Sequence, residues 1–161
     1  MVGKRVKTSP HKYEELQNYT YLCFLDSKFI KINEPFIENM INRFFIKNNY
    51  ALLLREHHFI KNNVINEYNE SMKQHRYILE SNKYKEYIQT QINNGLSKIT
   101  PHHGNCSLLI RNMKHEKINE INDTWYQHIQ ECGIQDQISF FFVKQLFRGY
   151  IHFFTEPPGI K

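Results

Sequence analysis

Hydrophobic and polar residues alternate along the chain in segments that predict both strands and helices. Three short apolar runs, at residues 20–25, 50–54 and 106–110, have the length and the aromatic and aliphatic content of strands buried on both faces. A fourth run, 150–154, predicts a last strand. The segments between these runs are longer and carry apolar residues at helical spacing. The sequence therefore predicts the α/β class, with a short, mostly buried sheet flanked by long helices.

The first long helix is expected to begin at Asn33, which can act as its N-cap. Phe36, Met40 and Phe44 follow at a spacing of four residues and form a stripe that we assign to the core. Helical spacing predicts four further helices, over residues 13–19, 62–80, 83–94 and 118–132.

The rest of the prediction depends on residues 122–145. This stretch holds the single tryptophan, Trp125, then Gly133 as a helix stop, then Asp136 and Gln137 at the start of a very apolar run. A carboxylate in the first turn of a buried helix lies beside unpaired backbone N–H groups and the positive end of the helix dipole, which favour its ionised form. Asp136 is therefore the main candidate for a catalytic base or hydrogen-bond acceptor. The alternative is an acid that only stabilises the helix start.

Length and composition are typical of one packed domain, which we assign to residues 1–154, with 155–161 as a tail. The three cysteines are widely spaced in apolar segments, so we expect reduced core residues in a cytoplasmic protein. They are Cys23, Cys106 and Cys132. The sequence shows neither a signal-peptide pattern nor an apolar run of about 18 residues, so no membrane span is expected.

The net charge of +5 comes from lysines and arginines that are scattered along the chain rather than clustered. Such a charge suits a phosphate-bearing small molecule, such as a nucleotide sugar, or an acidic glycan. The sequence has no helix-turn-helix, zinc-finger or RNP-like motif, so binding of nucleic acid is not expected.

Trp125, Ile129 and the run Gln-Asp-Gln-Ile-Ser-Phe at 135–140 resemble the signature near the end of a glycosyltransferase-like family. This family includes the plant TOD and MUCI proteins and bacterial relatives. Three other blocks of the family occur in the same order, at residues 5–13, 22–27 and 52–58, and the signature block itself begins at Leu108. The resemblance implies a truncated, Rossmann-like domain of the GT-A type. It also implies transfer of a sugar from a nucleotide-sugar donor to a glycan or protein acceptor.

The resemblance also implies roles for individual residues. Asp136 and Gln137 are expected to be catalytic. The residues expected at the donor diphosphate are Asp26, Ser27 and Arg111. The residues expected to line the substrate pocket are His11, His57, His58 and Trp125.

In GT-A enzymes the position of Asp26 belongs to a DxD-type element that coordinates Mn²⁺ or Mg²⁺, and oxygen ligands suit both ions. Some of these enzymes have a late histidine as a further ligand, a position that His152 matches here. Lys28 stands where a second acid would complete the DxD element.

The family has a nucleotide-binding half before the block at residues 5–13, and this sequence begins without it. One expectation is therefore a catalytic domain that needs a protein partner to supply the missing half. The other is a catalytically inactive, basic interaction domain that has kept the transferase fold.

Overall fold

The computed structural model of the chain describes residues 2–26, 32–60 and 62–155. Ser27 and most of the predicted tail lie outside these ranges. The helices, in chain order, are α1 (Val2–Thr8), η1 (Pro10–Lys12), α2 (Glu14–Gln17), α3 (Glu34–Met40), the π-helix η3 (Ile41–Ile46), α4 (Val64–Ser71), α5 (His75–Ile78), α6 (Ser81–Asn93), α7 (Ile118–Cys132) and α8 (Asp136–Leu146). The strands are β1 (Tyr21–Leu25), β2 (Leu52–Glu56), β3 (Gly104–Asn112) and β4 (Ile151–Phe154).

The four strands form one mixed sheet in the order β1-β3-β2-β4. The central strand, β3, pairs in antiparallel fashion with β1 on one side and β2 on the other, so that Leu109 lies opposite Phe24 and Leu54. The remaining pair, β2 with β4, is parallel. The predicted α/β class is confirmed, but the sheet is mixed, whereas the sheet of a Rossmann-like half is mostly parallel.

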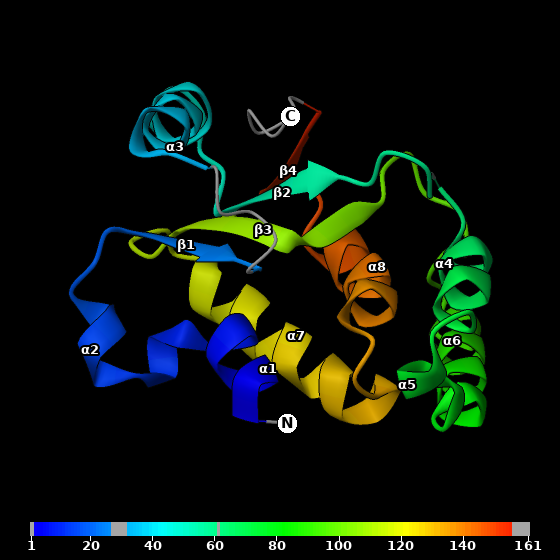
Figure 1. Cartoon of the computed structure of the whole chain (residues 1–161). Helices are drawn as coiled ribbons and strands as arrows, with labels where there is room; N and C mark the ends of the chain where they lie inside the picture. Colours follow the sequence, from blue (N-terminus) through cyan, green and yellow to red (C-terminus); the bar gives the residue numbers. More distant parts are fainter. Residues whose placement is uncertain (1, 27–31, 61, 156–161) are drawn as a thin grey trace.

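Helices cover both faces of the sheet (Figure 1). α1, α7 and α8 lie on one face, where Trp125 and Phe140 pack with Leu54 and Leu109 of the strands. α3 and η3 lie on the other face, where Met40 forms part of a second buried cluster. The predicted cap is also present, since the side chain of Asn33 accepts a hydrogen bond from the backbone N–H of Phe36 at the start of α3.

α8 is central because its apolar residues contact two layers at once. Phe140 and Val143 pack in the cluster beneath the sheet, whereas Phe141 and Phe142 pack against the cluster formed with α4, α5 and α6. Helices α4 to α6 stand beyond α8 at one end of the molecule (Figure 1). The prediction that 122–145 forms two helices separated at Gly133, the second of them buried, is confirmed.

Two predictions of local structure are wrong, and one helix was not predicted. The strand at 20–25 is not buried on both faces, because β1 is an edge strand, and Cys23 is exposed. The helix expected over 62–80 is two helices, α4 and α5, with a turn between Met72 and Gln74. The basic N-terminal segment, to which no helix was assigned, forms α1.

Candidate functional site

A cavity of about 450 Å³ lies where the first turn of α8 meets α1, β3 and the segment between β2 and α5. These elements are far apart in the chain. The residues that line the cavity include the acids Asp26, Glu67 and Asp136 and the bases Lys4 and Lys7. Such a polar wall suits a charged or heavily hydroxylated ligand.

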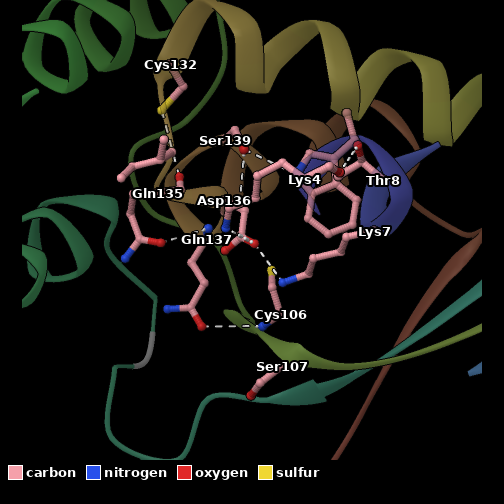
Figure 2. Close-up of polar contacts among 12 residues, drawn as sticks. Lys4, Lys7, Thr8, Cys106, Ser107, Cys132, Gln135, Asp136, Gln137 and Ser139 are labelled. Carbon is pink, nitrogen blue, oxygen red and sulfur yellow. Dashed lines mark hydrogen bonds and ion pairs between the residues drawn. The ribbon is translucent and has the colours of Figure 1, made fainter. Parts of the chain in front are cut away.

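Asp136 forms ion pairs with two lysines of α1 (Figure 2). Its Oδ2 atom lies 2.7 Å from Lys4 Nζ and 2.6 Å from Lys7 Nζ. Burial alone would raise the pKa of the Asp136 carboxyl, but the charges of Lys7 and Lys4 and their hydrogen bonds outweigh it and hold that pKa below its usual value. Asp136 is therefore an ionised carboxylate at neutral pH.

The two lysines reach Asp136 because α1 presents them on one face. Lys4 and Lys7 are three residues apart, which places them on neighbouring turns of the same side of a helix. The C-terminal end of α1 is fixed from the sheet, since Arg111 Nη2 donates to the backbone carbonyl of Lys7 at 2.7 Å. Lys7 is buried, whereas Lys4 is partly open to solvent.

A second buried network, around Glu67 of α4, forms the neighbouring wall. Glu67 Oε2 accepts from His103 Nε2 at 2.7 Å, and Oε1 accepts from the side-chain amides of Gln135 and Gln137 at 3.0 and 2.9 Å. Burial raises the pKa of Glu67, but the hydrogen bond and charge of His103 and the Gln137 bond offset this and leave that pKa lowered. The network ties α4 to the residues at the start of α8.

The structure brings five of the predicted site residues to one cavity. Asp26, His57, His58, Asp136 and Gln137 all line it. Asp26 lies directly after β1, where its backbone N–H donates to the carbonyl of Ser107 on β3. Gln137 is engaged at both ends of its amide, because Oε1 also accepts from the backbone N–H of Cys106 at 3.3 Å.

Four other predicted residues, Arg111, Trp125, His11 and His152, lie outside this cavity. Arg111 is 1% exposed, and its Nε donates to Asn122 at 2.9 Å; burial lowers its pKa to about 10, so it remains charged at neutral pH. Its hydrogen bond to the Lys7 carbonyl holds α1 in place, and its side chain does not reach the cavity where the nucleotide-sugar donor is expected. Trp125 is fully buried and donates from Nε1 to the hydroxyl of Ser139, so it belongs to the core.

His11 also lies apart from the cavity. Its Nε2 is 3.0 Å from Asp123 Oδ1 on α7, and the same carboxylate pairs with Lys12. Burial lowers the pKa of His11, although the charge of Asp123 acts in the opposite direction. The pair fastens the N-terminal segment to α7.

The residues expected to hold a metal ion do not come together. Asp26 follows β1 and His152 lies on β4, and these strands form opposite edges of the sheet. His152 instead stacks on the ring of Phe44, with a centroid separation of 4.3 Å. Within residues 2–26, 32–60 and 62–155, no group of three or more His, Cys, Asp or Glu side chains could hold a metal ion. These residues therefore do not fit the Mn²⁺ or Mg²⁺ site that the resemblance implies.

The sequence did not identify Lys4, Lys7 or Glu67 as site residues. The two lysines have helical spacing, but the segment lacks the apolar periodicity from which a helix is predicted. Glu67 lies within the single long helix that the spacing predicts over 62–80, where a charged side chain is expected on the polar face, but it is 2% exposed. Its carboxylate faces the start of α8, where the side-chain amides of Gln135 and Gln137 donate to it.

No protein-family model, curated protein or solved structure matched the chain. None of the helices in the described ranges is long and apolar enough to cross a membrane.

Proposed function

We propose that the chain is a glycosyltransferase-like protein of the GT-A type, which transfers a sugar from a nucleotide-sugar donor to a glycan or protein acceptor at the Asp136 cavity. One observation carries the proposal: a buried, ionised carboxylate lies between two lysines at the wall of a polar cavity. The resemblance of 135–140 to the family signature supports it, because Asp136 and Gln137 both line this cavity.

Lys4 and Lys7 are the groups that would receive the donor diphosphate. Ammonium groups bind phosphate oxygens through short, charge-assisted hydrogen bonds. Arg76 adds a third positive charge to the cavity wall. Since the expected metal ligands Asp26 and His152 lie at opposite edges of the sheet, the proposed reaction assigns the neutralisation of the leaving group to these side chains.

Asp136 would act as the base in the transfer step. The bond between the anomeric carbon and the diphosphate oxygen breaks, a bond forms between that carbon and the acceptor oxygen, and the acceptor's proton passes to the Asp136 carboxylate. A diphosphate that binds Lys4 and Lys7 neutralises their charges and so weakens the effect by which they lower the pKa of Asp136. Because burial then dominates, the pKa of Asp136 rises and the carboxylate becomes a stronger base in the donor complex.

Gln137 has a positioning role in this proposal. Its amide joins Glu67 on α4 to the backbone of β3 and so fixes the first turn of α8 relative to both walls. This arrangement holds Asp136 in place while a ligand enters.

A second candidate function is a catalytically inactive, basic interaction domain. The same ion pairs favour it in one respect, since Lys4 and Lys7 are already neutralised by Asp136 and could serve only to fasten α1. This candidate predicts that no nucleotide sugar binds. It also predicts that any polyanion binds with an affinity that falls steeply with salt.

The proposed function is tested with the full chain and a panel of nucleotide sugars. We expect at least one donor to raise the melting temperature, because a ligand of the native state stabilises it by mass action. Donor turnover should be lost in Asp136→Asn, whereas Asp123→Asn, which changes a carboxylate outside the cavity, should retain it. Retention of full turnover in Asp136→Asn would contradict the assigned base. A cooperative melting curve that no donor shifts would favour the inactive domain.

A further inference from the structure

Lys144 lies in the last turn of α8, and the reaction proposed above does not use it. Its side chain is 6% exposed, and its Nζ atom has no hydrogen-bond partner among the described residues. The Nζ atom lies 4.3 Å from the ring centre of Phe141 and 5.5 Å from that of Phe153. A buried ammonium group without an acceptor is unfavourable, and aromatic faces compensate only part of the lost hydration.

A cavity of about 120 Å³ lies beside this lysine, between the loop at 100–102, the end of α8 and β4. It shares no wall residue with the Asp136 cavity. Basic residues form one part of its wall, namely His102, Lys144 and Arg148. Apolar residues form another part, namely Pro101, Ile151 and Phe153.

No acidic residue is among the described residues that line this second cavity. Glu56, which is not a wall residue, pairs with His102 through Oε1 and Nδ1 at 3.2 Å. Lys144 and Arg148 therefore have no carboxylate beside them in the wall. The volume is that of about four water-sized groups. The wall therefore matches a small molecule with one anionic end and a short apolar part.

We propose that the second cavity binds a small organic carboxylate, whose oxygens accept hydrogen bonds from Lys144 and Arg148 and whose apolar part packs on Phe153. The ligand supplies the acceptor that Lys144 Nζ lacks. It also gives a role to a lysine that lies between the rings of Phe141 and Phe153, where an apolar side chain would pack without an unpaired charge.

The charges around Lys144 predict how binding depends on pH. Burial lowers the pKa of Lys144 to about 7, and the negative charge of Glu56 on β2 acts in the opposite direction. Burial raises the pKa of the Cys106 thiol well above its usual value, so this group stays neutral. His102 in the loop and Arg148 after α8 are the other titratable groups in the wall. Because the carboxylate binds the protonated amine, its affinity should fall about tenfold per pH unit above pH 7.

The test is a calorimetric titration of the full chain with propionate, at constant ionic strength, at pH 6.5, 7.5 and 8.5. Propionamide, which has the same shape without the charge, is the ligand control. Lys144→Met removes the amine, and Arg148→Gln removes the second cation at the mouth. Lys114→Met is the matched control, since Lys114 follows the far end of β3 and is exposed.

We expect Lys144→Met to weaken propionate binding at least tenfold at pH 6.5 and to remove its pH dependence above 7. Arg148→Gln should weaken binding several-fold, Lys114→Met should leave it unchanged, and propionamide should not bind. Equal binding of propionate by the unaltered chain and Lys144→Met would overturn the proposal, as would the absence of binding at pH 6.5. Both results are independent of nucleotide-sugar binding at the other cavity.

Discussion

Lys7 and Asp136 form an ion pair of 2.6 Å, although 129 residues separate them in the chain, and both side chains are more than nine-tenths buried. This ion pair joins the N-terminal helix, α1, to the first turn of the central helix, α8. The candidate catalytic group is therefore held by the part of the chain furthest from it in sequence, and the stability of the fold and the chemistry of the site depend on the same contact.

Asp136→Ala should lower the free energy of unfolding by about 3 kcal/mol, because it leaves the buried Lys7 without its counter-charge. Asp123 offers a matched control. It also pairs with two basic side chains but is half exposed, so Asp123→Ala should cost less than about 1 kcal/mol. Urea unfolding of both variants measures the difference. Similar losses in the two variants would show that burial of the Asp136 pair contributes little.

Glu67→Ala should cost about 3 kcal/mol, since it leaves the buried His103 and two glutamine amides without their common acceptor. Glu70, one turn further along α4, pairs with Lys73 at the surface. Glu70→Ala should therefore change stability by less than about 0.5 kcal/mol. Thermal unfolding distinguishes the two, and a small effect of Glu67→Ala would contradict the described network.

Gly133→Ala should destabilise the chain by about 2 kcal/mol or more. Gly133 has φ +113° and ψ −166°, a conformation that only glycine adopts readily, and an added Cβ would collide with the Glu80 carboxylate. Gly3 in α1 is the control, because a Cβ there meets nothing within 4 Å. Gly3→Ala should raise stability slightly, by about 0.5 kcal/mol, through its higher helix propensity. A neutral Gly133→Ala variant would refute this account of the α7–α8 turn.

The lowered pKa of Lys144 predicts how the free energy of unfolding depends on pH. Burial lowers its pKa in the folded chain to about 7, below its value of about 10.4 in an unfolded chain. Between these values the unfolded state holds a proton that the folded state has lost, so the free energy of unfolding rises with pH. The rise attributable to Lys144 should be roughly 1.4 kcal/mol per pH unit above pH 7.

The measurement compares Lys144→Met with the unaltered chain from pH 6 to pH 9. Lys144→Met should be the more stable protein at pH 6, and its advantage should shrink as the pH rises. A constant difference between the two proteins across this range would mean that Lys144 does not titrate there.

The sequence predicted the parts of the fold that local patterns determine. The tryptophan helix, the stop at Gly133 and the buried helix beginning at Asp136 follow from apolar spacing and one glycine, and the structure confirms each. The cap at Asn33 is a further local pattern that the structure confirms. In each case the residues that define the element lie within a few positions of one another.

The parts that tertiary contacts determine were not predicted. α1 contains polar and basic residues and is held by Lys7 with Asp136 and by Arg111 with the Lys7 carbonyl, contacts that no local pattern contains. Cys23 lies in an apolar run that is typical of a buried strand, but its strand became an edge of the sheet and left it exposed. Strand order and direction follow from the packing of the whole chain, so the mixed sheet could not be predicted from apolar runs alone.

The site was only partly predicted, because some of its residues are marked by local patterns and others are brought there by tertiary contacts. Asp136, Gln137, Asp26 and the two adjacent histidines lie after strands or at a helix start, and the structure places them around one cavity. Arg111 also follows an apolar strand core, yet its side chain points into the packing between sheet and helices and contacts Asn122. Sequence position distinguishes strand ends from strand centres, but not which way a long side chain turns.

The most direct test of the central claim is calorimetric titration of the full chain with nucleoside diphosphates, with and without Mn²⁺, in two double variants. Lys4→Met with Lys7→Met removes both lysines at Asp136, whereas Lys12→Met with Lys114→Met removes the same charge elsewhere. We predict that at least one diphosphate binds the unaltered chain, that the first double variant weakens this binding at least tenfold, and that the second leaves it unchanged. The absence of binding by any diphosphate, or equal affinities in the two double variants, would contradict a donor site at Asp136.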